Sequence, residues 1–148
     1  QRQMCIRDRI TTRVATASGT IILNDEAFSS VVELNNKKGD VLNTARIAGI
    51  NAAKQTSNLI PLAHNISLNS VDIDFQFNNK TNEIISIAQV KSEGKTGVEI
   101  EAMIAVQISL MTIYDMCKYL DRAMEINKIR LLSKTGGKSG TFDRGDSV

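Results

Sequence analysis

The hydrophobic and polar positions of the chain first indicate a β-hairpin. Residues 71–77 alternate apolar with polar side chains, which is the period of a half-buried strand. The polar segment 78–82 predicts a turn, and residues 84–91 then return as a second strand. Short apolar runs at 19–23 and 128–132 predict two further strands.

Two helices are predicted between the first strand and the hairpin. Asn24 is a favourable N-cap for a helix over 25–35, and Asp40 is one for a helix that reaches about Ser57. A lysine-rich turn separates them, and a loop around Pro61 follows the second. The inward side chains are expected to be Ala27, Phe28, Val31, Val32 and Leu34 in the first helix and Val41, Leu42, Ala45, Ala48, Ala52 and Ala53 in the second.

A third, longer helix is predicted over 97–120. Thr96 and Glu99 have the spacing of a capping box at its start. Between Ile100 and Cys117 the segment is apolar nearly all round, so the helix is expected to be buried on more than one side. One small domain cannot cover such a helix completely, and we therefore expect a subunit interface along it.

The resulting order is β-α-α-β-β-α-β, which predicts an α+β fold with a ferredoxin-like antiparallel sheet packed with helices. We expect a single domain over residues 10–142 and a C-terminal tail over 143–148. Residues 1–9 have no methionine at position 1 and no hydrophobic period, and we interpret them as a non-native leader.

Charge and composition exclude several classes of function. The 148 residues carry 18 basic and 16 acidic side chains, and once residues 1–9 are set aside the rest has 15 of each. A neutral chain with 4% aromatic residues is a poor candidate for nucleic-acid binding. Two cysteines make no disulfide framework, and Cys117 is expected to be a buried thiol. No apolar run is expected to be long enough to span a membrane, so the sequence predicts a soluble, cytoplasmic protein.

Asp115 and Lys118 are the first candidates for chemistry, because their spacing of three residues places them on one face of the long helix. They could form a partly buried ion pair of purely structural value. They could equally be an acid/base pair whose proton affinities are tuned by burial and by each other.

Two glutamates at the start of the same helix raise a question of geometry. The capping box would explain Glu99 completely, whereas Glu101 is either a solvated first-turn residue or a functional one. Glu101 and Asp115 are fourteen residues apart, about 21 Å along a helix axis. They therefore serve opposite ends of a large ligand, or different protomers contribute them to one site.

Residues 134–140 (Lys-Thr-Gly-Gly-Lys-Ser-Gly) favour contact with an anion, since glycine lets backbone N–H groups approach a ligand and lysine supplies charge. Lys38, Arg46 and Lys54 could extend an anion site or could be surface charge. His64 is the only histidine, and without a second histidine or a cysteine cluster a metal site is not expected. Phosphate contact or proton transfer is its stronger functional interpretation.

Several motifs occur in the order that is typical of one enzyme family. The chain from about Thr11 to Phe142 resembles the molybdenum cofactor biosynthesis protein C family, the cyclic pyranopterin monophosphate synthases. The segments that carry the resemblance are Lys38–Val41, Ala45–Ile50, Leu59–Leu62, Thr96–Glu99, Tyr114–Lys118, Arg130–Leu132 and Gly136–Gly140.

The resemblance implies a lyase of molybdenum cofactor (molybdopterin) biosynthesis. Such an enzyme converts 3',8-cyclo-7,8-dihydro-GTP into cyclic pyranopterin monophosphate and releases pyrophosphate. The family assembles as a homohexamer, a trimer of dimers with active sites at subunit interfaces, which agrees with the spacing of Glu101 and Asp115. The sequence requires no cofactor but leaves open Mg²⁺ on the triphosphate. A non-catalytic nucleotide-binding or assembly subunit is the alternative.

The family's functional residues are carried over by motif. The catalytic set implied by the resemblance is Asp115, Lys118 and Lys38. The substrate-binding set is Leu62, Ala63, His64, Glu99, Ile100, Glu101, Lys54, Lys134 and Arg13. The chain departs from the usual family pattern at Ala63, Asn65, Ile100 and Thr135, and the change at Asn65, where proline is usual, is expected to loosen the His64 loop.

Overall fold

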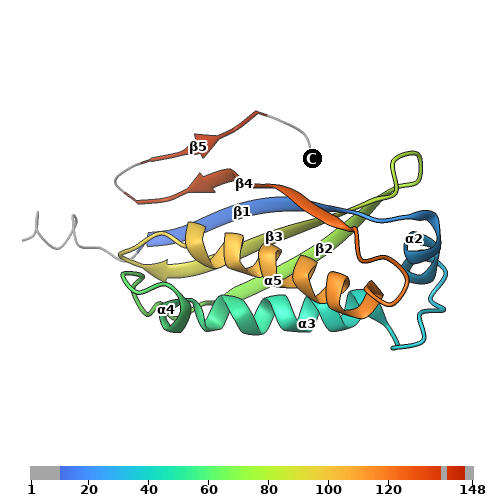
Figure 1. Cartoon of the computed structure of the whole chain (residues 1–148). Helices are drawn as coiled ribbons and strands as arrows, with labels where there is room; N and C mark the ends of the chain where they lie inside the picture. Colours follow the sequence, from blue (N-terminus) through green and yellow to red (C-terminus); the bar gives the residue numbers. More distant parts are fainter. Residues whose placement is uncertain (1–10, 138–139, 146–148) are drawn as a thin grey trace, which may run out of the picture.

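One antiparallel sheet, covered on one face by helices, makes up the molecule. The computed structural model describes residues 11–137 and 140–145 (Figure 1). The strands are β1 (Thr11–Ile22), β2 (Ser70–Asn78), β3 (Glu83–Gly94), β4 (Glu125–Thr135) and β5 (Phe142–Asp143). The helices are α2 (Asp25–Val32), α3 (Val41–Lys54), α4 (Thr56–Leu59) and α5 (Glu99–Cys117). The α+β architecture predicted from the sequence is confirmed.

The sheet has the order β2-β3-β1-β4-β5, and every neighbouring pair is antiparallel. The crossover from β1 through α2 and α3 leaves a gap beside β1, and β3 fills that gap after the β2–β3 hairpin. This is the ferredoxin-like arrangement. Helices α3 and α5 lie side by side below the sheet in Figure 1. The two short elements α4 and β5 were not predicted.

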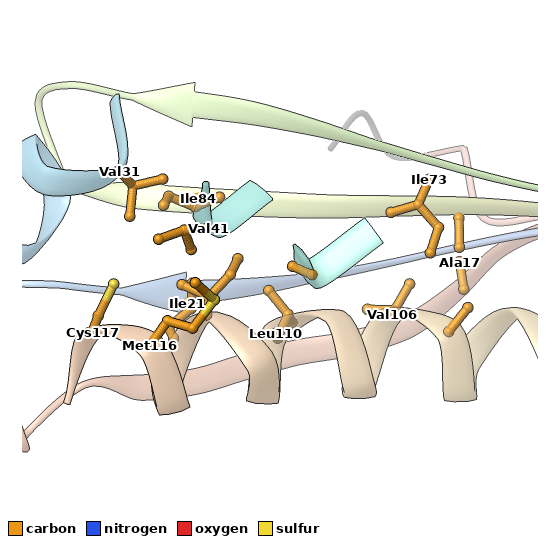
Figure 2. Close-up of a cluster of buried hydrophobic side chains, with 14 of the residues drawn as sticks. Ala17, Ile21, Val31, Val41, Ile73, Ile84, Val106, Leu110, Met116 and Cys117 are labelled. Carbon is orange, nitrogen blue, oxygen red and sulfur yellow. The ribbon is translucent and has the colours of Figure 1, made fainter. Parts of the chain in front are cut away.

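The centre of α5 lies unusually close to β1. A Cβ built on Gly19 would lie 2.5 Å from Ile129, 2.8 Å from Val106 and 2.9 Å from Leu110, so these side chains would have to move to admit one. Ala15 and Ala17 on the same face of β1 are also fully buried. Figure 2 shows Ala17, Ile21, Val106 and Leu110 in this layer between strand and helix. Small side chains on β1 therefore let a bulky apolar helix pack closely against the sheet.

Several sequence-based boundaries were wrong. The strand predicted at 19–23 is the end of a twelve-residue strand, and the one at 128–132 is the middle of β4. The helix predicted over 25–35 ends at Val32, so Val32 is partly exposed and Leu34 is 72% exposed, with a left-handed φ of 58°. The N-caps Asn24 and Asp40 are confirmed, because each side chain accepts a backbone N–H from the first turn.

The capping box predicted for α5 does not form. The N-cap residue is Val98, and the cap has no side-chain hydrogen bond. The carboxylate of Glu99 instead lies 3.5 Å from the Lys134 ammonium of β4. The helix ends at Cys117 rather than near residue 120. An ion pair between helix and strand has replaced the local cap.

The expectation that no segment has the length and apolarity of a membrane span was also wrong. Helix α5 meets both criteria, and half of its apolar window is buried inside the molecule. Ala102, Ala105, Val106, Leu110 and Ile113 are fully buried in the core. Because α3 and the sheet cover these side chains, α5 is explained as the central helix of the core.

Candidate functional site

The first group of predicted site residues lies at the C-terminal end of α5. The Lys118 ammonium is 3.1 Å from the Asp115 carboxylate, and their side chains are 50% and 65% exposed. The desolvation expected from the apolar sequence around them is not seen in the single chain, because both side chains face solvent. An exposed pair of this kind stabilises a fold by at most about 1 kcal/mol. The pair therefore contributes little to the stability of the fold.

The loop that carries Lys38 is attached to the same end of α5. The side-chain amide of Asn36 donates to the Met116 carbonyl oxygen at 3.2 Å. The backbone N–H of Lys37 donates to the Tyr119 hydroxyl at 3.0 Å, and the Lys37 ammonium lies 4.3 Å from the centre of the Tyr119 ring. These contacts bring the exposed Lys38 to the end of the helix where Asp115 and Lys118 lie. The three predicted catalytic residues thus share one end of the molecule.

Cys117 lies beneath this end, and the prediction of a buried free thiol is confirmed. Burial raises the pKa of the thiol, a hydrogen bond with Ser30 lowers it, and the charge of Asp121 raises it. With burial the largest effect, the thiol stays protonated at neutral pH, and it is not a candidate nucleophile.

The second group lies at the opposite end of α5, where β1 begins and β4 ends. The Glu99–Lys134 ion pair joins the helix to β4, with side chains 30% and 22% exposed. Arg13 donates from Nε to the Gly94 carbonyl at 2.8 Å and from Nη2 to the Lys95 carbonyl at 2.8 Å. A Cβ on Gly137 would overlap the Arg13 guanidinium. Arg13 therefore holds together the chain segments that surround Lys134.

Glu101 is buried in the first turn of α5, with 3% of its surface exposed. The alternative of a solvated first-turn glutamate is therefore wrong. Burial raises the pKa of its carboxyl, a hydrogen bond from its own backbone N–H lowers it, and the nearby Glu99 charge raises it. Its neighbour Ile100 is 44% exposed. In this turn Ile100 is the exposed side chain. Glu101 is buried, and the pKa of its carboxyl is raised.

The remaining predicted residues lie near this second end as well. Lys54 is exposed at the last position of α3, and Leu62, 92% exposed, follows α4 with Ala63 and His64 in an extended loop. Helix α4 contacts α5, and Figure 1 shows α4 beside the end of the molecule where α5 starts. The loop predicted around Pro61 is confirmed.

The glycine-rich run is only partly a loop. Lys134 and Thr135 belong to β4, and the chain leaves the sheet at Gly136 and Gly137, both with positive φ. Lys138 and Ser139 lie outside the described residues, as do residues 1–9 of the expected leader. Within the described ranges, no three His, Cys, Asp or Glu side chains gather closely enough to hold a metal ion.

The structure thus separates the predicted site into two groups. Lys38, Asp115 and Lys118 lie at one end of α5, and the residues assigned to substrate binding lie toward the other, about 21 Å away along the helix. Sequence reasoning missed Asn36 and Tyr119, which fix the Lys38 loop to the helix. The signal for Asn36 was available, because asparagine two residues before a Lys-Gly pair is typical of an Asx turn.

These observations define a small ferredoxin-like α+β protein, with an exposed ion pair at one end of its core helix and several cationic side chains toward the other. Comparison with known proteins identifies the family. The MoaC family model matches residues 6–137. The chain belongs to the MoaC family.

Named relatives agree with this assignment. The chain is 53% identical to the cyclic pyranopterin monophosphate synthase of Clostridium botulinum (strain Alaska E43 / Type E3), over 89% of this chain and 83% of that protein. It is 52% identical to the protein of the same name from Limosilactobacillus fermentum, over 94% and 84% of the two chains. The Helicobacter pylori (strain Shi470) protein of that name is 50% identical, over 93% and 88%.

Proposed function

We propose that the chain is a cyclic pyranopterin monophosphate synthase. It takes 3',8-cyclo-7,8-dihydro-GTP as substrate and acts as a lyase that releases pyrophosphate, in the cytoplasm and within molybdenum cofactor biosynthesis. The single observation that carries this proposal is the pairing of Asp115 with Lys118 at 3.1 Å on an exposed face of α5, beside the loop of Lys38. Because the pair is exposed and lies beside the Lys38 loop, its carboxylate and ammonium can reach a ligand, as acid and base groups must.

The reaction needs proton transfers and stabilisation of phosphate charge. Opening the purine ring takes up one water, and closing the new ring releases one. A substrate hydroxyl oxygen then bonds to the α-phosphorus, its proton goes to a base, and the bond to pyrophosphate breaks with the electron pair on the leaving group. Asp115 and Lys118 supply the acid and base groups for these transfers, together with Lys38.

The binding group suits the triphosphate and the base of this substrate. Lys134 and Lys54 supply cationic charge, which stabilises the negative charge that develops on departing pyrophosphate. Arg13 braces this region through its two carbonyl contacts. Exposed Leu62 and Ile100 offer apolar surface, and His64 a polar group, to the rest of the ligand. A Mg²⁺ ion carried on the triphosphate is compatible with this scheme.

We propose that the two groups meet across a two-fold interface. An outward row on α5 consists of Ile100, Ile104, Gln107, Ile108, Met111, Thr112, Asp115 and Lys118. Its centre is apolar, and Met111 is 54% exposed. If two copies of α5 packed antiparallel with the axis near Ile108, the turn that carries exposed Ile100 and buried Glu101 would lie opposite the partner's Asp115. Each dimer would then contain two complete sites, and three dimers would form the homohexamer.

Light scattering tests the assembly. We expect a mass well above 16.2 kDa at micromolar concentration, and a smaller one for Met111→Lys, which places charge in the proposed interface. Gln76→Lys, an exposed change on β2, is the matched control and should leave the mass unchanged. A monomeric wild-type chain would contradict the interface.

The activity is tested by incubating the purified chain with 3',8-cyclo-7,8-dihydro-GTP, with and without Mg²⁺, and measuring pyrophosphate and cyclic pyranopterin monophosphate together. Wild type should form both in equal amounts, and Lys38→Ala should form both at least about a hundredfold more slowly while still binding the substrate. Tight substrate binding by wild type without any product would favour the non-catalytic alternative. Binding by neither protein would overturn the assignment of the substrate.

A further inference from the structure

We infer that Asn36 is a positioning residue for Lys38, and that it sets where the lysine stands relative to Asp115 and Lys118. This inference rests on the proposed function, because Lys38 is catalytic only within it. Asn36 itself is 7% exposed and carries no charge. It acts through the loop that precedes α3 and through the last turn of α5.

The Asn36 side chain makes contacts in two directions. Its amide nitrogen donates to the Met116 carbonyl at 3.2 Å and to the Ser30 hydroxyl at 3.2 Å, and it lies 3.6 Å from the Cys117 sulfur. Its amide oxygen accepts the Lys38 backbone N–H at 2.8 Å. One buried side chain therefore links α2, the end of α5 and the Lys38 loop.

These contacts determine the shape of the loop. The carbonyl of Asn36 accepts the Gly39 N–H at 3.1 Å, which closes a four-residue turn, and Gly39 has a φ of 113°. Because the side chain also accepts the Lys38 N–H, the peptide on each side of Lys38 is held. The direction in which the lysine leaves the loop follows from these bonds.

The attachment point on α5 lies within the catalytic turn. Met116 directly follows Asp115, and its carbonyl is one of the last four of the helix, which have no partner inside the helix. Asn36 provides that partner. A shift of the last helical turn therefore also moves the Lys38 loop. The positions of Lys38, Asp115 and Lys118 relative to one another are thereby maintained.

Substitution of Asn36 should change turnover more than substrate affinity. Asn36→Leu keeps the approximate size of the side chain but removes every polar contact. We expect kcat to fall about tenfold to a hundredfold, the scale found for small misplacements of a catalytic group. KM should stay within about twofold, because the binding group lies at the other end of α5. Asn35→Ala, an exposed change at the adjacent position, is the matched control and should leave both constants unchanged.

A double-mutant cycle separates positioning from a general structural effect. When Lys38 is already alanine, adding Asn36→Leu should reduce the residual rate less than about twofold, because the residue through which Asn36 acts is missing. A general weakening of the fold would reduce the rate equally in both backgrounds, and that result would overturn the inference. If Asn36→Leu does not fold, Asn36→Ser, which is neutral and polar but too short for both directions, should give the same pattern with smaller changes.

Hydrogen exchange tests the inference without any assay of activity. Protection of the Lys38 amide should fall at least about tenfold in Asn36→Leu and remain unchanged in Asn35→Ala. Unchanged protection in Asn36→Leu would overturn the positioning role even in an active enzyme. A wild-type chain that forms no product, but in which the Lys38 amide loses protection as expected, would locate the failure in the proposed function and leave the link between Asn36 and the loop established.

Discussion

The two ends of α5 are built in opposite ways. At the C-terminal end, Asp115 and Lys118 are at least half exposed and pair only across one turn of helix. At the N-terminal end, Glu101 is buried, and the Glu99–Lys134 pair is mostly shielded from solvent and joins two different elements. The first end is open to solvent and is held by loop contacts, whereas at the second end the charged groups of α5 are shielded by their own fold.

This difference indicates which property each end should control. Groups that are loosely held within one chain cost little stability when they are altered, so their substitution should mainly affect chemistry. Groups that bridge a helix and a strand contribute to packing, so their substitution should affect both substrate binding and stability. The predictions below test this contrast, beginning with the largest expected effect.

Lys118→Arg should separate chemistry from stability at the exposed end. Arginine keeps the positive charge but cannot release a proton near neutral pH, so kcat should fall about a hundredfold or more. The free energy of unfolding should change by less than about 1 kcal/mol, because the ion pair is exposed. Steady-state kinetics and urea unfolding measure the two quantities. Near-wild-type turnover in a folded variant would leave Lys118 as a charge that only holds the site together.

Subunit mixing should show whether the two ends belong to one composite site. Glu101→Ala and Asp115→Ala are each expected to be inactive. In a random equal mixture half of the dimers are mixed, and one of their two sites has both native groups, so about a quarter of wild-type turnover should return. Mass spectrometry confirms exchange of protomers. Mixed dimers without recovered turnover would show that the two protomers do not contribute Glu101 and Asp115 to one shared site.

Lys134→Ala should mark the enclosed end as the binding end. The variant loses a cation near the proposed triphosphate position and leaves Glu99 without its ion-pair partner. We expect KM to rise about tenfold with a smaller change in kcat, because the loss affects bound substrate and transition state alike. Lys80→Ala, on the β2–β3 turn, is the control. A change confined to kcat would reverse the roles assigned to the two ends.

Glu101→Gln should have the smallest effect, one on the pH dependence of stability. Because the folded pKa of Glu101 is raised above 4.5, its contribution to stability is fully present below that pH and is lost as pH rises through the folded pKa. Glutamine removes this loss. Urea unfolding of both proteins should therefore show the variant gaining stability relative to wild type between pH 4.5 and neutral pH. A constant difference across this range would contradict a raised pKa.

Much of the fold could be predicted from the sequence, because its signals are local. The hairpin follows from alternation at 71–77, and the helix starts follow from Asn24 and Asp40, whose side chains reach only three residues ahead. Residues 11–18 of β1 were missed, because Ala15 and Ala17 are weak strand formers whose small size matters only under α5. This part of the strand is determined by packing against α5, and a short stretch of sequence gives no information on such packing.

Sequence spacing predicted which candidate site residues lie together, but not how deeply each is buried. Helical spacing correctly paired Asp115 with Lys118 and separated both from Glu101. The partial burial expected for the pair was wrong, since both side chains are exposed, and the burial of Glu101 had been left open. Burial depends on which face of an almost uniformly apolar helix meets the sheet and α3, and a helix that is apolar all round gives no sign of that face.

The close fit at Gly19 has a consequence for how the protein tolerates mutation. Gly19 lies under the middle of α5, and a side chain there would meet Ile129, Val106 and Leu110. Helix α5 is continuous and carries one group of candidate site residues at each end, so a shift of its centre away from the sheet would displace both groups together. A methyl group added more than a helical turn from any reacting atom would thus alter affinity and turnover in one step. Gly19 is therefore a position where genetic screens should recover loss of function without any change in chemistry.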